Sequence, residues 1–174
     1  KGIGHNAFKN NNAYGKYLFY SATANLYHVQ GDYVKAETLY RKAIETANSD
    51  LRTIDLSENY LNMARCLDKL TRRSEGVELL EKGLKNVKTT NGKALMYIQL
   101  CKMLYWEKRY GDYISYYHKA KQYFGKEIST DMAAYMTAIK EIIEGNADKA
   151  EKTAMGINNP DDRYAVLREV YVAT

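Results

Sequence analysis

The chain has 174 residues, of which 45% are hydrophobic, so it has enough apolar content to bury a core. Its formal net charge of +5 favours an acidic partner, but the charge is not gathered into the basic runs that are typical of nucleic-acid arms. A single proline and 17 tyrosines against one tryptophan indicate uninterrupted helices with aromatic packing that recurs along the chain. We therefore predict an all-α fold.

The two cysteines, Cys66 and Cys101, lack CxxC or Cys/His spacing, so we predict two buried thiols rather than a zinc site or a disulfide framework. We find no apolar run long enough for a membrane span, and the first residues have no signal-peptide core. Because the chain begins at Lys1 and stops at Thr174 inside a predicted helix, we expect a fragment of a longer protein.

Residues 1–15 are rich in Asn, Gly and Lys and show no periodicity, so we expect a loosely ordered N-terminal segment. Gly2 and Gly4 form a lone GxG. No strand precedes it and no third glycine follows at the required distance, so it does not predict a dinucleotide-binding loop.

Residues 20–43 carry two short amphipathic helical patterns that meet at Gly31. The motif positions hold Tyr20, Ala24 and Tyr27 in the first pattern and Ala36, Tyr40 and Ala43 in the second. This spacing resembles W-x2-L-G-x2-Y followed by A-x3-F, the pattern of the tetratricopeptide repeat (TPR) family. The resemblance implies an α-solenoid whose concave face binds a protein or a peptide.

Three further repeats can be aligned with the first. Their motif positions are Tyr60, Met63, Ala64, Leu67, Gly76, Leu80 and Gly83, then Tyr97, Leu100, Cys101, Leu104, Tyr113, Tyr117 and Ala120, then Ala134, Thr137, Ala138, Ala150, Ala154 and Ile157. In the third repeat, a register moved by three residues would align Gly111 with Gly31, but it would put Glu107 on the buried face, so we keep the first register. In the fourth, Glu141 occupies a position that should be apolar.

The alignment predicts one repeat domain over residues 16–174, with repeats at about 16–50, 51–90, 91–127 and 128–158 and a terminal helix at 161–172. The terminal helix has its apolar stripe at Tyr164, Leu167, Val170 and Tyr171. It either caps the array or begins a fifth repeat, and the stripe favours the second reading. The same stripe could pair with another copy and give a homo-oligomer.

The sequence carries no catalytic motif, and its three histidines lie on separate segments without further ligands at metal-binding spacing. We therefore expect no enzyme activity, no cofactor and no metal. The candidate functional residues are those on the inner face of the first helix of each repeat, because stacking buries the motif positions between them. They are Ser21, Asn25, His28, Leu61, Asn62, Arg65, Lys69, Ile98, Gln99, Lys102, Tyr105, Trp106, Tyr135 and Ile139.

Within this groove, Arg65, Lys69 and Lys102 are expected to form a basic strip, and Tyr105 and Trp106 are candidate aromatic anchors or packing residues. Some TPR domains hold a peptide carboxylate with lysines, an arginine and two asparagines. Only the asparagine places match that clamp, at Asn25 and Asn62, while the other three hold Ser21, Leu95 and Gln99. The two amides are expected either to bond a peptide backbone or to be structural.

These features predict a non-enzymatic scaffold that binds an acidic or mixed peptide, or a partner helix. As an alternative, the array is similar to the sensor segments that precede a membrane span and an output domain in bacterial regulators, which would place it outside the cytoplasm. Nucleic-acid binding is disfavoured, because the repeats vary in length and share no base-reading pair of residues.

Overall fold

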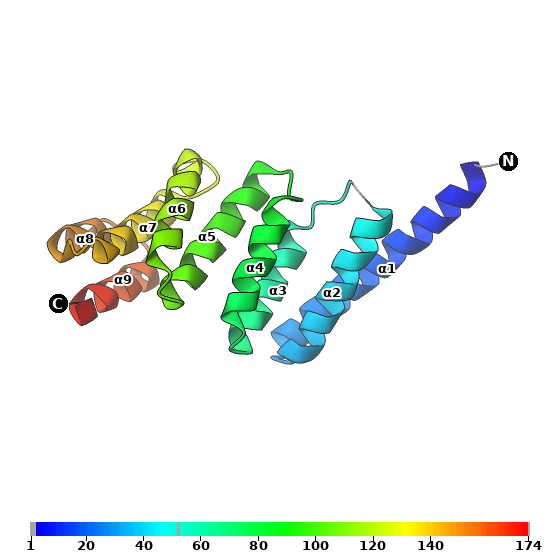
Figure 1. Ribbon diagram of the computed structural model, residues 1–174, viewed down its shortest axis with the longest axis horizontal. Coiled ribbons are helices and arrows are strands. Elements are labelled where there is room, and N and C mark those ends of the chain that lie inside the picture. The colour runs from blue at the N-terminus through cyan, green and yellow to red at the C-terminus, as the bar shows by residue number, and fades with distance from the viewer. Residues whose placement is uncertain (1–2, 52, 174) are drawn as a thin grey trace. The chain divides into compact units, whose positions relative to one another are not determined.

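The computed structural model describes residues 3–51 and 53–173, and within these ranges the chain is all helical apart from turns and one isolated β-bridge. Its nine α-helices there are α1 (Ile3–Val29), α2 (Tyr33–Asp50), α3 (Ser57–Lys69), α4 (Arg73–Leu84), α5 (Thr90–Trp106), α6 (Tyr110–Ala120), α7 (Thr130–Ile143), α8 (Ala147–Met155) and α9 (Pro160–Ala173) (Figure 1). The all-α prediction is confirmed, and neighbouring helices pack in pairs. None of the described helices is both long and apolar enough to cross a membrane.

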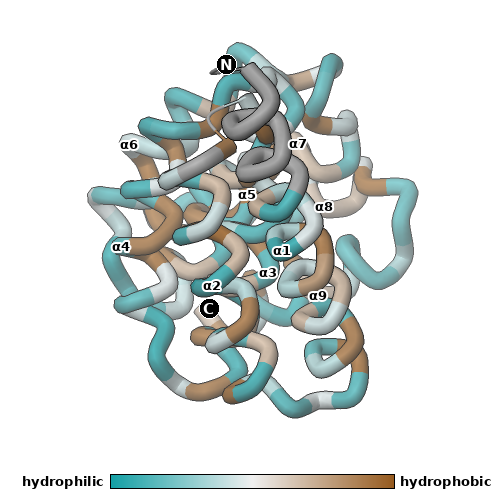
Figure 2. Tube along the Cα trace, turned by 90° about the vertical axis from the view of Figure 1, so that its right-hand side faces the viewer, coloured by the Kyte–Doolittle hydropathy of each residue, from teal (hydrophilic) through white to brown (hydrophobic). Residues whose placement is uncertain are grey.

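The chain divides into two compact units, Lys1–Met96 and Tyr97–Thr174, where the sequence predicts one repeat domain over residues 16–174. In unit 1, α1 packs against α2, α3 packs against α4, and α3 also contacts α1 and α2. In unit 2, α7 packs against α8, and α9 covers both of them. Along the coloured part of the tube in Figure 2, hydrophobic residues recur between hydrophilic ones.

Most of the segment at residues 1–15, which the sequence predicts to be loosely ordered, lies within α1, which begins at Ile3. Asn and Gly have low helix propensity, but a helix that is already nucleated gains one backbone hydrogen bond for each residue that it adds. α1 therefore reaches 27 residues, while its partner α2 has 18. Propensity alone could not reveal this extension.

The turn between the two helices of a pair has the same backbone conformation four times. A residue with positive φ ends the first helix, and these residues are Gly31 (81°), Thr71 (61°), Lys108 (58°) and Gly145 (77°). In each turn the next amide N–H donates to a carbonyl five residues earlier, over 2.8–3.0 Å: Asp32 to Tyr27, Arg72 to Leu67, Arg109 to Leu104 and Asn146 to Glu141. This is a Schellman-type helix end. The left-handed residue of the third turn is Lys108 rather than Gly111, which confirms the register that we kept.

The second helix of each pair begins three residues before its small-residue motif position. These positions are all buried: Ala36, Gly76, Tyr113 and Ala150. Tyr113 fits where the others are small because its hydroxyl donates to the backbone carbonyl of Met136 on α7, at 2.7 Å. A buried phenol that finds an acceptor adds apolar area without leaving a polar group unpaired.

Helices approach each other closely at Gly83. A Cβ built there would lie 2.8 Å from Cγ of Tyr60 and 2.8 Å from Cε of Met96, and both side chains are buried. No larger residue fits between them without a shift of the Tyr60 ring. The two predicted buried thiols are found as well, since Cys66 and Cys101 are free and buried.

Two acidic side chains, Glu37 and Glu141, are buried. Glu37 is 8% exposed and forms ion pairs with Arg41 and with Arg72 at the start of α4, each at 2.7 Å. Glu141 is 2% exposed, accepts a hydrogen bond from the Thr153 hydroxyl at 2.7 Å and lies 3.3 Å from Nζ of Lys149. Each buried carboxylate thus has at least one partner on, or at the start of, another helix.

The predicted stripe of the terminal helix is divided between two faces of α9. Val166 and Val170 are buried, while Tyr164 is 71% and Tyr171 is 62% exposed. Tyr164, Leu167 and Tyr171 have the spacing of the motif positions in the first helix of a repeat. In the other repeats these positions lie on the side of the first helix that packs against the second helix. α9 therefore resembles the first helix of a pair.

Candidate binding surfaces

The predicted groove residues of unit 1 form three contacts between α1 and α3, which we call the α1–α3 ladder. Nδ2 of Asn59 donates to the Ser21 hydroxyl oxygen at 2.9 Å, Nδ2 of Asn62 lies 3.4 Å from Oδ1 of Asn25, and Sγ of Cys66 lies 3.4 Å from Nδ1 of His28. The residues are three or four apart on each helix, so the contacts rise one helical turn at a time.

Most polar groups of the ladder already have partners within the protein. Oδ1 of Asn25 also accepts a hydrogen bond from the Tyr40 hydroxyl at 2.5 Å, and burial raises the pKa of Tyr40 to about 12. Burial lowers the pKa of His28, with the positive charges of Arg65 and Lys69 acting in the same direction, so the imidazole is neutral at pH 7. A ligand at Asn25 would meet an amide oxygen that already accepts a strong hydrogen bond, which favours the structural reading of this asparagine.

Other predicted groove residues are divided between surface and core. Arg65 and Lys69 are exposed on α3, and Nη1 of Arg65 donates to Oδ1 of Asn62 at 3.1 Å. Leu61 and Ile139 are only 4% and 1% exposed, so their prediction as groove residues is corrected: they belong to the core. Counting residues from a motif position cannot distinguish a core residue from a groove residue when the two lie on adjacent faces of one helix.

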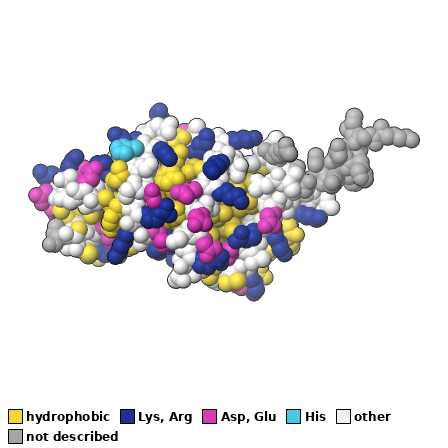
Figure 3. Space-filling model, in the orientation of Figure 1, with side chains coloured by type: hydrophobic (Ala, Val, Ile, Leu, Met, Phe, Trp, Pro, Cys, Tyr) yellow, Lys and Arg dark blue, Asp and Glu magenta, His cyan; other side chains and the backbone are white. Residues whose placement is uncertain are grey.

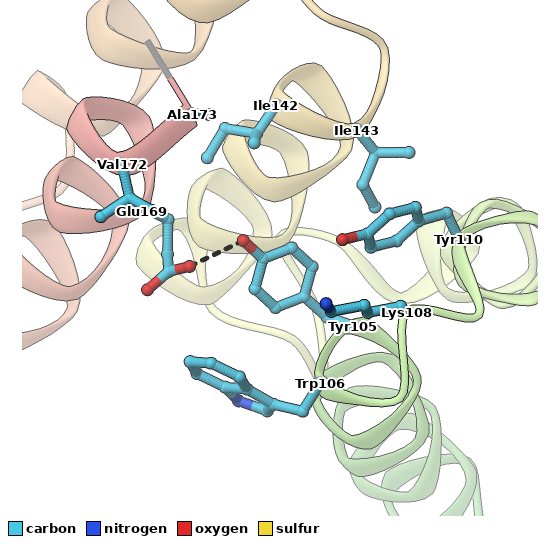
Figure 4. Close-up of a pocket in the computed structure, with 9 residues that line it drawn as sticks. All are labelled: Tyr105, Trp106, Lys108, Tyr110, Ile142, Ile143, Glu169, Val172 and Ala173. Atoms are coloured by element: carbon cyan, nitrogen blue, oxygen red, sulfur yellow. Dashed lines mark hydrogen bonds between the residues drawn. The ribbon is translucent and has the colours of Figure 1, made fainter.

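In unit 2, two of the predicted residues, Tyr105 and Trp106, line a pocket of about 360 Å³ (Figure 4). The remaining lining residues come from the turn between α5 and α6 and from α6, α7 and α9, and they are Lys108, Tyr110, Ile142, Ile143, Glu169, Val172 and Ala173. Trp106 is 49% and Tyr110 is 41% exposed, so the wall of the pocket presents aromatic surface to solvent.

Tyr105 is held at the centre of this pocket. Its hydroxyl donates to Oε2 of Glu169 at 2.8 Å (Figure 4), and its ring lies 5.5 Å from that of Trp106 and 6.0 Å from that of Tyr110, centroid to centroid. Burial, together with the Glu169 carboxylate, raises the pKa of Tyr105. The phenol stays protonated at neutral pH and remains a donor to the carboxylate.

Beside the pocket, Nζ of Lys102 lies 5.5 Å from the ring centroid of Tyr135, a cation–π distance. Ile98 and Gln99, one turn earlier on α5, are half-buried. The predicted basic strip of Arg65, Lys69 and Lys102 draws on both units and stays a prediction. On the face that Figure 3 presents, basic and acidic side chains lie intermingled.

Sequence reasoning found two of the nine pocket residues and missed the rest. Ile142, Ile143 and Glu169 lie at helix ends, where the repeat motif has no fixed residue. Glu169 meets Tyr105 from 64 positions along the chain, a contact that local periodicity does not encode. The only local signal is the cluster of aromatic residues at Tyr105, Trp106 and Tyr110.

Among the described residues, no group of three His, Cys, Asp or Glu side chains is arranged to hold a metal ion. Comparison of the chain with protein-family models, with curated proteins and with solved structures found no match.

Proposed function

We propose that this chain is a binding module of four TPR-like repeats, stacked as an α-solenoid, which takes a large apolar side chain of a peptide or partner helix into the pocket of unit 2. The observation that carries the proposal is the half-exposed indole of Trp106 beside Tyr105 and Tyr110. Trp and Tyr are enriched among residues that dominate binding energy, because one end of each ring is apolar and the other can hydrogen-bond.

The chemistry of the pocket suggests what the ligand carries. Ile142, Ile143 and Val172 supply an apolar wall, and a volume of about 360 Å³ suits one or two large side chains. Lys108 and Glu169 add one charge of each sign. A peptide with an aromatic or aliphatic anchor flanked by an acidic and a basic residue would match both the wall and the charges.

The repeated turn supports the TPR part of the proposal. The left-handed positions, Gly31, Thr71, Lys108 and Gly145, are 40, 37 and 37 residues apart, which equals the spacing of the motif positions in the second helices. Repeats that contact their neighbours in order produce the extended surfaces on which such scaffolds bind.

Trp106 is the single tryptophan of the chain and therefore reports on its own pocket. Peptides selected from a random library against the purified chain are added, and the fluorescence of Trp106 is followed. We expect emission to move to shorter wavelength as the ligand covers the indole, and Tyr110→Ala to weaken binding roughly tenfold.

Tyr164→Ala is the matched control, because Tyr164 is exposed but does not line the pocket. It should bind like the unmodified chain. Selected peptides that bind without moving the emission of Trp106, and with equal affinity for the Tyr110→Ala variant, would refute the pocket as the binding site.

A further inference from the structure

α1 carries an exposed apolar stripe on the side opposite its buried residues Ala13 and Ala24. The stripe, which we call the α1 stripe, consists of Gly15, Leu18, Ala22, Leu26 and Val29. These positions follow i, i+3, i+7, i+11 and i+14, so they form one continuous face of the helix. Leu18, Leu26 and Val29 are 46%, 55% and 85% exposed.

The helix around this stripe has almost no charge. Lys16 is the only Lys, Arg, Asp or Glu between residues 10 and 31, in a chain that is 27% charged. Phe19 borders the stripe and is 63% exposed. A long exposed helix face that is apolar and depleted of charge is the composition of the centre of a protein interface.

The internal repeat indicates that part of this face corresponds to a packing face. The residues 40 positions after Phe19, Ala22 and Leu26 are Asn59, Asn62 and Cys66 on α3. All three contact the preceding first helix, through the α1–α3 ladder. α1 has apolar residues at these three positions. Ala22 and Leu26 belong to the stripe and Phe19 borders it, and all three are exposed.

We propose that the α1 stripe pairs with the α1 stripe of a second copy, with the two helices antiparallel and Ala22 at the two-fold axis. The spacing of the stripe is self-complementary about Ala22. In that arrangement Leu18 faces Leu26 of the partner, Ala22 faces Ala22, and Gly15 faces Val29, so each large residue meets a leucine or the space over a glycine. A Cβ at Gly15 would meet nothing within 4 Å inside the protein, so this space is open. An isologous contact of this kind closes the pair and leaves no further stripe exposed.

The size of the contact indicates a weak interface rather than a permanent one. From Gly15 to Val29 the helix rises about 21 Å, and two helices about 10 Å wide in contact over that length bury on the order of 400 Å² each. The total of about 800 Å² lies below the roughly 1,200–2,000 Å² of standard stable interfaces. We therefore expect a weak dimer that dissociates on dilution.

Sedimentation velocity over a range of concentrations tests the proposal. We expect the purified chain to pass from monomer to dimer between about 1 and 200 μM, and Leu26→Lys to raise the dissociation constant at least about tenfold. Met155→Lys is the control, because Met155 is 61% exposed on α8 and outside the stripe. It should dimerise like the unmodified chain. A chain that stays monomeric at 200 μM, or a dimer that Leu26→Lys leaves intact, would overturn the proposal.

Two further variants test the antiparallel register. Leu18→Glu alone should dissociate the dimer, while Leu18→Glu combined with Leu26→Lys should restore it, since each new carboxylate then faces a new ammonium group of the partner. Ala22→Cys should form an intermolecular disulfide under oxidising conditions, and Glu78→Cys, at an exposed site on α4, should not. Circular dichroism confirms that each variant is folded. Failure of the double variant to dimerise, together with no cross-link at Ala22→Cys, would contradict the two-fold arrangement.

Discussion

Replacing the two non-glycine residues at left-handed turn positions with glycine should stabilise the protein. Thr71 and Lys108 have φ of 61° and 58°, a conformation that costs a residue with a Cβ about 1–2 kcal/mol. Glycine relieves this cost but adds about 0.5–1 kcal/mol of chain entropy in the unfolded state. We therefore expect a net gain of about 0.5–1 kcal/mol for Lys108→Gly.

Thr71→Gly should give a similar gain. Threonine is β-branched, which makes its left-handed conformation more costly, but the variant loses the exposed hydrogen bond from the Thr71 hydroxyl to the Leu70 carbonyl at 2.6 Å. The two turns share no hydrogen-bond partner, so the gains should add, and the double variant should gain about 1–2 kcal/mol.

The assay is equilibrium unfolding in urea, followed by far-UV circular dichroism. Gly31→Ala and Gly145→Ala are the matched reverse variants, since a Cβ at either site would meet nothing within 4 Å. Any loss at these positions comes from the backbone alone. It should be about 0.5–1 kcal/mol, because alanine adds the left-handed strain but removes the extra chain entropy of glycine in the unfolded state. A loss of stability in Lys108→Gly, or no change in Gly31→Ala, would refute the argument that the four turns share one strained conformation.

Gly83→Ala should destabilise the protein by about 1–3 kcal/mol, because the new Cβ would lie 2.8 Å from the buried Tyr60 ring. Gly111→Ala on α6 is the control in the same urea assay. Its Cβ would meet no atom within 4 Å, so the change should be neutral or stabilising. Glu37→Gln should cost about 1–2 kcal/mol, because two arginines lose their shared carboxylate, and Glu75→Gln, more than half exposed, should change the urea midpoint little. Burial raises the pKa of Cys66 to about 11 and that of Cys101 to about 12. Both thiols should therefore react with an aromatic disulfide reagent at pH 8 only after the protein unfolds. Rapid reaction in the folded state would contradict their burial. Since the unfolded thiols ionise near pH 9, their contribution to stability is full below pH 9 and is lost as the pH rises towards 12, which urea midpoints measured across that range would check.

The pairing of helices could be predicted from the sequence because it depends on local periodicity. Ala36 and Tyr40, or Tyr113 and Tyr117, are four residues apart on one helix face, and burial of that face requires a second helix close by. The register of the third repeat followed from the same residues. The left-handed turns at Thr71 and Lys108 carry no signal in residue type, so only their spacing from the neighbouring motifs locates them.

The candidate pocket could be predicted only in part. Tyr105 and Trp106 were found because they follow the motif of a first helix, but Glu169 joins them by a contact that depends on how α9 packs on α7. Leu61 and Ile139 were assigned to the groove because a motif offset is accurate to about one residue, and one residue turns a helix by 100°. At that precision, core and groove cannot be separated.

The two buried carboxylates affect unfolding in different ways, Glu141 within unit 2 and Glu37 within unit 1. Glu141 joins α7 to α8 and so contributes to the intrinsic stability of one helix pair. Glu37 instead joins α2 to Arg72 at the start of α4, and so belongs to the interface between two pairs. In a nearest-neighbour description of a helical array, interactions within a helix pair determine how stable that pair is. Interactions between adjacent pairs determine how cooperatively the pairs unfold. Hydrogen exchange in unit 1 should therefore show α1 to α4 opening as a single block, and Glu37→Gln should split that block at the junction between α2 and α3.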